Sequence, residues 1–325
     1  MIDFINIMED TGILAFIKES NIEKARTIVE AVKKSNLNIV EIDYSIDNAD
    51  YILNKLSNEY PEIIFAASDI SSKKDVENAV KSGAKYVSTR DLNLEIIEFC
   101  KEKSILLIPF VSTVREVEFA VSSGFKILKM LAVESLGEED PIKFIAERYK
   151  PIKIMVHGDV NSSNIARYMN MDGVISCALE IPFEKESLLE DIKKEDIKEI
   201  LSEEIYKLIL AGLDFRLAHV GINTSSNNEA LNIANMFSKI FGLKTKEEVP
   251  SYFSGEIVEV MKFMGKGKNG HIAISTSSIE RAVYYISKQG IEFDKESFVI
   301  EDSLLVRAYL KEEIAGFAVH LIRDM

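Results

Sequence analysis

The sequence of 325 residues has only two cysteines and no apolar run long enough to cross a membrane. A membrane-spanning helix needs about 18 or more consecutive apolar residues, so no membrane partner is expected. The first residues, Met1-Ile2-Asp3-Phe4, lack the basic and apolar regions of a signal peptide. Cys100 and Cys177 are far apart in the sequence and are expected to be reduced thiols. These absences predict a cytoplasmic protein.

Positive charge is also scarce, since 39 Lys and Arg residues are set against 53 Asp and Glu residues, a net charge of −14. Residues 1–212 carry 26 basic and 38 acidic side chains, a net charge of −12. A negative surface repels the phosphates of nucleic acids and anionic lipids. We therefore expect no nucleic-acid partner, and an anionic substrate would need a local positive site.

Two common phosphate-binding motifs are missing. No GxGxxG follows the first expected strand, which argues against a dinucleotide-binding domain. The glycine- and lysine-rich stretch 265–270 lacks the GK[ST] ending and the strand–loop–helix context of a P-loop. Its last two residues, Asn269-Gly270, are more typical of a turn between antiparallel strands.

Between Gly12 and about Leu210, short β-rich runs alternate with amphipathic helical runs. Gly83 and Gly124 stand just past two of the helical runs, where helices commonly end. Eight β/α units in about 200 residues predict a (β/α)₈ TIM barrel, an α/β fold, over a first domain of residues 1–212. Its strands are expected at 13–17, 39–42, 63–66, 86–88, 106–109, 127–130, 152–156 and 173–176, and a long helical stretch at 184–210 follows them.

Residues 213–325 have a different pattern, in which a strand, a helix and further strands occur twice with a period of about 50 residues. This pattern predicts a smaller α+β domain of paired βαβββ-type modules. Strands are expected at 215–222, 256–263, 271–275, 304–310 and 317–322, and helices at 229–241 and 279–289.

Two charged residues are expected inside the apolar barrel. The buried strand at 125–134 contains Lys126 and Lys129, whose odd spacing sends them to opposite faces. Lys129 is flanked by Leu and Met, and Glu41 by Val and Ile. Burial favours the neutral, nucleophilic amine, and a facing carboxylate can shuttle protons. The pair therefore predicts a Schiff-base lyase, and the alternative is a buried ion pair that only stabilises the barrel.

Residues 12–180 resemble the keto-deoxy-phosphogluconate / keto-hydroxyglutarate (KDPG/KHG) aldolase family of class I aldolases. The matching stretches are 40–42 (VEI), 109–113 (PFVST) and 128–135 (LKMLAVES). The resemblance implies that Lys129 forms the Schiff base, that Glu41 is the acid and base, and that no cofactor takes part. It also implies cleavage of a 2-keto-4-hydroxy (3-deoxy) acid to pyruvate and an aldehyde, in a homo-oligomer that is commonly a trimer.

The sequence departs from this family where substrate anions are bound. The region after Glu41, which usually has an arginine, reads Asp43-Tyr44-Ser45-Ile46, and a Gly-Gly turn is replaced by His157-Gly158-Asp159. Fewer glycines and added aspartates predict an altered phosphate site. Whether the substrate is phosphorylated, and whether the barrel is active, are therefore open. The candidate substrate-binding residues are Lys18, Arg90, Thr113, His157 and Asp159.

Three of the four histidines lie in expected strands of the second domain, together with one glutamate: His219, His271, His320 and Glu259. Imidazole and carboxylate groups suit a divalent Zn, Ni, Mn or Fe. The domain is similar to the vicinal-oxygen-chelate (glyoxalase/bleomycin-resistance) fold at 217–222, 270–274 and 316–321, and this resemblance implies a metal site at these residues. Alternative functions are a metal-dependent lyase or isomerase centred on this domain, and a non-catalytic binding protein on a degraded barrel.

Overall fold

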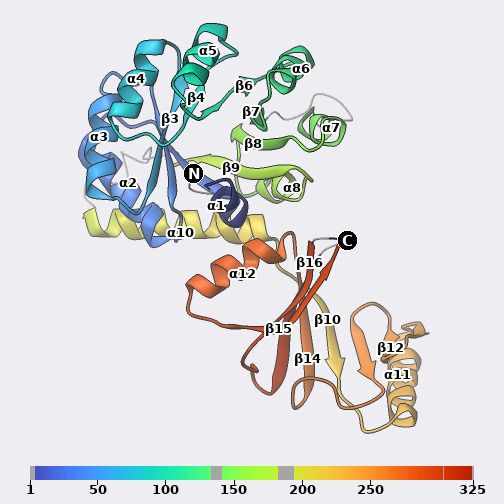
Figure 1. Cartoon of the computed structure of the whole chain (residues 1–325). Coiled ribbons are helices and arrows are strands. Elements are labelled where there is room, and N and C mark those ends of the chain that lie inside the picture. The colour runs from blue at the N-terminus through green and yellow to red at the C-terminus, as the bar shows by residue number, and fades with distance from the viewer. Residues whose placement is uncertain (1–3, 133–140, 182–193, 303, 324–325) are drawn as a thin grey trace. The chain divides into compact units, whose positions relative to one another are not determined.

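The computed structural model describes residues 4–132, 141–181, 194–302 and 304–323. The chain divides into two compact units, Met1–Gly212 and Leu213–Met325 (Figure 1). Residues 133–135 of the aldolase-like stretch and residues 184–193 of the expected long helix lie outside the described residues. No helix in the described ranges is both long and apolar enough to cross a membrane.

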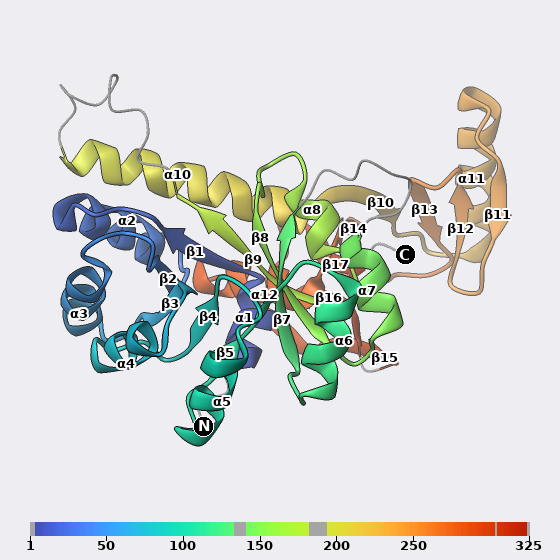
Figure 2. The same cartoon turned by 90° about the horizontal axis from the view of Figure 1, so that it is seen from above.

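The first unit alternates short parallel strands with helices, which surround the strands in Figure 2. The strands are β1 (Ile13–Ile17), β2 (Ile39–Asp43), β3 (Ile64–Ile70), β4 (Val87–Thr89), β5 (Leu107–Ile108), β6 (Phe110–Val111), β7 (Ile127–Ala132), β8 (Lys153–Gly158) and β9 (Val174–Glu180). The helices are α1 (Phe4–Thr11), α2 (Ile22–Lys34), α3 (Ala49–Glu59), α4 (Lys73–Lys81), α5 (Leu94–Glu102), α6 (Val114–Ser122), α7 (Pro141–Arg148), α8 (Ile165–Met169) and α10 (Lys194–Leu213).

Pro109 closes the barrel. The strand order is β5-β4-β3-β2-β1-β9-β8-β7-β6, and Pro109 alone separates β5 from β6. Proline has no N–H for the ladder, so it interrupts the strand, but its carbonyl still accepts from the Lys129 N–H at 2.9 Å. Strands β5 and β6, which stand at the two ends of this order, are therefore two pieces of one strand, and the sheet closes on itself. The predicted eight-stranded α/β barrel is confirmed, with its fifth strand broken in two.

An N-terminal helix that the sequence pattern did not predict fills one end of the barrel. Phe4 and Met8 of α1 belong to the same buried cluster as Ile39 and Ile127, which begin β2 and β7. The Phe4 ring stacks on Tyr86 with 5.2 Å between centroids. Because α1 packs at the end where the strands begin, the opposite end, where they terminate, is left for a site.

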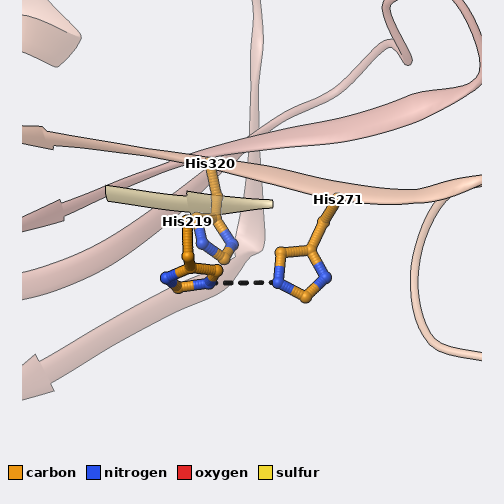
Figure 3. Close-up of side chains that lie close together, drawn as sticks. All are labelled: His219, His271 and His320. Carbon is orange, nitrogen blue, oxygen red and sulfur yellow. Dashed lines mark hydrogen bonds between the residues drawn. The ribbon is translucent and has the colours of Figure 1, made fainter. Parts of the chain in front are cut away.

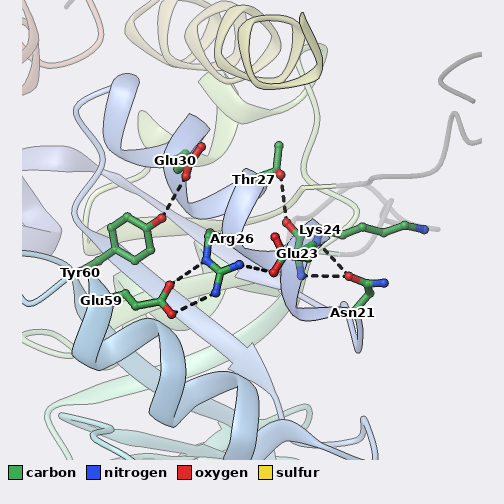
Figure 4. A network of polar contacts seen from close by, with 8 residues as sticks. All are labelled: Asn21, Glu23, Lys24, Arg26, Thr27, Glu30, Glu59 and Tyr60. Carbon is green, nitrogen blue, oxygen red and sulfur yellow. Dashed lines mark hydrogen bonds and ion pairs between the residues drawn. The ribbon is translucent and has the colours of Figure 1, made fainter. Parts of the chain in front are cut away.

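A polar network joins α2 to α3 on the outside of the barrel (Figure 4). Arg26 donates to both carboxylate oxygens of Glu59, at 2.7 and 3.0 Å, and also contacts Glu23. Asn21 begins α2 by accepting from two backbone N–H groups of the first turn. The exposed network orients neighbouring helices and lies apart from the strand ends.

The second unit repeats the order strand, helix, strand, strand, strand. Its first module has β10 (Arg216–Ile222), α11 (Asn227–Phe241), β11 (Thr245–Glu247), β12 (Ser251–Ser254) and β13 (Val258–Met261). Its second has β14 (Gly270–Thr276), α12 (Ile279–Lys288), β15 (Phe293–Glu301), β16 (Leu304–Leu310) and β17 (Phe317–Arg323). The predicted pair of βαβββ modules is therefore present. The pattern missed β11, β12 and β15, because β11 and β15 are polar edge strands and β12 is short.

One mixed sheet contains both modules, in the order β11-β12-β13-β10-β14-β17-β16-β15. The first strands of the two modules, β10 and β14, pair antiparallel at the centre. Within each module the first strand runs parallel to the last, as β10 to β13 and β14 to β17. The modules are thus related by an approximate twofold rotation.

Candidate functional site

The barrel contains a buried lysine–glutamate pair. Lys129 Nζ on β7 lies 2.5 Å from Glu41 Oε2 on β2, and the two residues are 1% and 0% exposed. Lys129 also donates to Ser68 Oγ at 2.8 Å. Lys126, on the other face of the strand, is exposed. The amine thus has a proton acceptor within direct reach and no competition from bulk water.

Tyr86 binds the other oxygen of Glu41. Its hydroxyl donates to Glu41 Oε1 at 3.1 Å, and the ring is fully buried against Phe4. Burial, with the charge of Glu41, raises the pKa of Tyr86 well above its usual range, so the phenol stays a donor. Tyr86 was not among the site residues predicted from the sequence.

A pocket of about 290 Å³ opens above this pair at the carboxyl ends of the strands. Thr113 and Asp159 are not among its lining residues. Thr113 instead caps α6 in a reciprocal pair with Glu116, and Asp159 is exposed and accepts from Asn161. The lining residues are Phe16, Lys18, Asp43, Ser68, Asp69, Thr89, Arg90, Phe110, Lys129, Leu131, His157 and Glu180.

The two cations at the rim of the pocket are each beside a carboxylate. Lys18 Nζ lies 3.5 Å from Asp43 Oδ2. Arg90 donates to both oxygens of Asp69, at 2.9 and 2.6 Å. Glu180 adds another negative charge to the lining. The pocket therefore has little excess positive charge with which to hold a phosphate dianion.

His157 lies on the same wall of the barrel as Lys129. Met155 pairs with Lys129 across β8 and β7, and His157 is two residues nearer the mouth on the same face. Its ring is edge-on to Phe16, with 4.6 Å between centroids. Burial, aided by the charge of Lys129, lowers the pKa of His157 to about 4, so the imidazole is neutral at pH 7. Its Nδ1 is buried and has no hydrogen-bond partner among the described residues.

A second cluster lies in the sheet of residues 213–325 (Figure 3). His219 Nε2 lies 3.2 Å from His271 Nε2, and Glu259 Oε2 lies 3.3 Å from the first and 2.9 Å from the second. His320 completes the group, and one ring nitrogen from each histidine lies within 4.8 Å of the others. The four side chains named from the sequence are thus brought together.

The charges in this cluster are unusual. Burial alone would raise the pKa of Glu259, but hydrogen bonds from His219, His271 and Ser251 outweigh it and hold that pKa far below its usual range. Burial, with the neighbouring histidines, lowers the pKa of His320 to about 3. Both ring nitrogens of His320 are buried without a partner in the described ranges. The cluster therefore offers an ionised carboxylate and a neutral imidazole.

The twofold repeat builds the cluster from equivalent positions. Gly221 pairs with Glu259 and with His271, while Ala273 pairs with His320 and with His219. The rotation therefore exchanges His219 with His271, and Glu259 with His320. Gly221 is needed where it stands, because a Cβ there would lie 2.0 Å from the His271 ring.

The comparison with protein families decides the class of the barrel. The family model described as "KDPG and KHG aldolase" matches residues 4–202. The chain belongs to the KDPG and KHG aldolase family. It therefore carries an aldolase-family domain of the lyase class, and residues 213–325 lie beyond the matched range.

Relatives in this aldolase family are distant. The 2-dehydro-3-deoxy-phosphogluconate aldolase of Haemophilus influenzae is 24% identical over 170 residues, which cover 52% of this chain and 80% of that protein. The KHG/KDPG aldolase of Escherichia coli is 21% identical over 170 residues, with the same coverage of 52% and 80%.

Solved structures share the aldolase barrel. A KDPG aldolase from Legionella pneumophila, with pyruvate captured as a covalent carbinolamine intermediate, aligns with a TM-score of 0.55 at 19% identity, over 62% of this chain and 97% of that one. The 2-keto-3-deoxy-6-phosphogluconate aldolase of Zymomonas mobilis with 3-phosphoglycerate aligns with a TM-score of 0.55 at 17% identity, over 62% and 94%. At these identities the likeness shows a common fold.

Proposed function

We propose that the barrel is a class I aldolase that cleaves a 2-keto-4-hydroxy (3-deoxy) acid to pyruvate and an aldehyde. The observation that carries the proposal is the buried Lys129–Glu41 pair beneath a pocket at the carboxyl ends of the strands. This is the end of a TIM barrel at which active sites lie. The captured pyruvate adduct of the Legionella relative supports the same chemistry.

In this mechanism Lys129 is the nucleophile. Glu41 takes a proton from Nζ as the amine attacks the substrate C2 carbonyl, and a proton returned to the oxygen lets water leave. The resulting iminium accepts the electrons of the C3–C4 bond when the C4 hydroxyl loses its proton and the aldehyde departs. Protonation of the enamine at C3 and attack by water release pyruvate and the free lysine.

The neutral His157 imidazole and the rim cations are the groups proposed to hold the substrate. His157, on the wall above Lys129, suits the C4 hydroxyl, because its Nδ1 has no other partner in the described ranges. Lys18 or Arg90 would hold the carboxylate by turning from Asp43 or Asp69. Since both cations already face carboxylates, we propose a substrate without a phosphate group.

Borohydride reduction in the presence of pyruvate tests the mechanism directly. The wild-type protein should gain a stable mass that maps to Lys129, and the Lys129→Ala variant should gain none. Lys126→Ala is the matched control, because this exposed lysine lies on the other face of the same chain segment. A wild-type protein without an adduct, or an adduct on Lys126, would reject the proposal.

The substrate class needs a separate measurement. Initial rates of pyruvate release should be higher with 4-hydroxy-2-oxoglutarate than with 2-keto-3-deoxy-6-phosphogluconate. Replacing both rim carboxylates, as Asp43→Asn with Asp69→Asn, should narrow this preference by leaving Lys18 and Arg90 free for phosphate. Faster cleavage of the phosphorylated acid by the wild-type protein would contradict the charge argument while leaving the Schiff-base proposal intact.

A second candidate function is a metal-dependent lyase or isomerase centred on residues 213–325. The observation that favours it is the convergence of three imidazoles and a carboxylate, with separations of 2.9, 3.2 and 3.3 Å between three of the donor atoms. Donors bound about 2.0–2.2 Å from a common Zn²⁺ lie roughly 3–3.5 Å from one another, so the donor atoms of His219, His271 and Glu259 fit a divalent metal, and a nitrogen of His320 lies within 4.8 Å of the other two imidazoles. His219, His271, His320 and Glu259 would hold it, and it would supply Lewis-acid chemistry.

Metal analysis tests this second function. Purified protein loaded with Zn²⁺ or Mn²⁺ and then dialysed should retain one equivalent, and His271→Ala should lose it. Retention of the metal by His271→Ala would reject the site. Neither a metal nor a pyruvate adduct is expected if the chain is instead a non-catalytic binding protein.

A further inference from the structure

The twofold repeat is broken beside the histidine cluster. Phe253 of β12 pairs with Glu259, and Tyr309 of β16 pairs with His320, so the two aromatic residues occupy equivalent positions. Two residues earlier on each strand, Ser251 pairs with Met261, and Arg307 pairs with Ile322. The rotation therefore relates a phenylalanine and a serine in one module to a tyrosine and an arginine in the other.

On the Phe253 side of the cluster the cation is already paired, because Lys246, the cross-strand neighbour of Phe253 on β11, forms an ion pair with Glu248 at 2.7 Å. The Phe253 ring is edge-on to His219, with 5.6 Å between centroids. Ser251 is fully buried and donates to Glu259 at 2.6 Å. Strand β12 itself, with the sequence SYFS, contributes no charged side chain to this side.

The Tyr309 side is cationic. The Tyr309 ring is edge-on to His320, with 4.4 Å between centroids. Lys266 Nζ lies 4.8 Å from the centre of the same ring, and the Arg307 guanidinium carbon lies 5.9 Å from it. Two cations on one half-buried ring repel each other, so this arrangement is costly unless negative charge is close by.

Only one of these two cations is neutralised by the described part of the protein. Lys266 forms an ion pair with Asp294 at 2.7 Å. Arg307 is exposed and forms no ion pair with any residue in the described ranges. Lys266, Arg307 and Asp294 together carry one net positive charge, and the ionised Glu259 of the cluster also acts on the Tyr309 ring. This balance matches a monoanion such as a carboxylate better than a phosphate dianion.

We infer that Arg307, Lys266 and Tyr309 form an anion subsite beside His320, which takes the carboxylate of a small organic acid whose apolar part faces Phe253. The inference rests on the second candidate site proposed above, but the cations that define it are present with or without a metal. A planar guanidinium can bind a carboxylate through two parallel hydrogen bonds. Because Arg307 and Lys266 lie on the Tyr309 side, the carboxylate of the acid is directed towards Tyr309 and its apolar part towards Phe253.

Phenyllactate is a suitable probe, because it has a carboxylate and an aromatic group but no keto group that could form an imine with Lys129. Its methyl ester is the matched neutral ligand. Binding to the full wild-type chain would be measured by calorimetry, both after chelator treatment and after loading with Mn²⁺. The acid should bind more tightly than the ester in both preparations, by about tenfold, which corresponds to about 1.4 kcal/mol.

Arg307→Gln should remove most of this difference between acid and ester in both preparations. Arg216→Gln is the control, because Arg216 is exposed in the same unit and is already paired with Asp214, and it should leave the difference unchanged. Equal binding of acid and ester, or an undiminished preference in Arg307→Gln, would overturn the inference. A preference that requires Mn²⁺ and ignores Arg307 would overturn it too, while supporting the metal site.

Discussion

Lys129 Nζ and Glu41 Oε2 lie 2.5 Å apart, across residues separated by 88 positions in the sequence, and neither side chain reaches solvent. Such a pair costs desolvation energy that its own attraction only partly returns. A pair kept only for stability could be replaced by apolar residues at little cost. The stability of variants therefore bears on whether the pair is structural or catalytic.

The first prediction concerns this pair. Lys129→Met leaves Glu41 buried without its partner, and we expect the free energy of unfolding to fall by about 3–5 kcal/mol. Lys129→Met combined with Glu41→Leu should recover most of that loss, because the unpaired charge is removed. Urea denaturation followed by circular dichroism measures both, with Lys126→Met as the exposed control. A double variant that is stable but forms no pyruvate adduct indicates that the pair is retained for chemistry. A double variant no more stable than Lys129→Met would contradict the argument that the unpaired charge of Glu41 causes the loss.

The second prediction concerns Tyr86, which we expect to position Glu41 for proton transfer. Tyr86→Phe removes one hydrogen bond to a buried carboxylate, so stability should fall by about 1–3 kcal/mol. The borohydride adduct on Lys129 should persist, because the nucleophile is untouched. Exchange of the pyruvate methyl protons with D₂O should slow by about tenfold, since the proton shuttle is less well aligned. Exchange at the wild-type rate would leave Tyr86 with a purely structural role.

The barrel could be predicted from the sequence because short β-rich runs alternate with amphipathic helical runs along the first unit. Helix α1 was missed, since Phe4–Thr11 has only eight residues. Asp3, directly before it in the sequence, is a residue type common at helix starts and was a usable signal. Tyr86 was missed for another reason. Its partner Glu41 is 45 residues away, and only the register of the parallel strands brings the two together.

A helix-capping residue can be mistaken for a substrate-binding residue when only the sequence is read. Thr113 was a candidate for substrate binding, yet Thr113 and Glu116 have the spacing of a capping box and form one. That signal is visible in the sequence and could have separated the two roles. The histidine cluster was predicted because the βαβββ repeat places its members at equivalent strand positions, so symmetry supplied the long-range information that a single strand lacks.

The third prediction concerns pH. The pKa of His157 is about 4 in the folded protein, below the ordinary value of 6.5. Between these values the unfolded chain binds a proton that the folded chain does not. Stability should therefore fall as pH is lowered from 6.5 towards 4, by up to about 1.4 kcal/mol per pH unit for this one group, and the contribution should level off below 4. His157→Gln should flatten this part of the profile.

Thermal denaturation at several pH values, followed by circular dichroism, measures the effect. His320 contributes in the same direction, because its pKa is lowered to about 3, so His320→Gln is the companion variant. The effects of the two variants should be independent of each other, since the histidines belong to separate units. A profile that His157→Gln leaves unchanged would mean that the pKa of His157 is the same in the folded and the unfolded chain, contrary to its burial.

The last prediction concerns Gly221, whose Cα faces the His271 ring. A methyl group at this position would lie 2.0 Å from the imidazole, closer than any real contact, so the ring must move. Gly221→Ala should therefore weaken Zn²⁺ binding by at least about tenfold, as expected when a ligand is displaced from its position. Competition with a chromogenic chelator measures the affinity. Pyruvate trapping on Lys129 is the internal control and should be unchanged, because the barrel is a separate unit. Wild-type Zn²⁺ affinity in Gly221→Ala would show that His271 is not a ligand, and the metal site would have to be abandoned or rebuilt from His219, His320 and Glu259 alone.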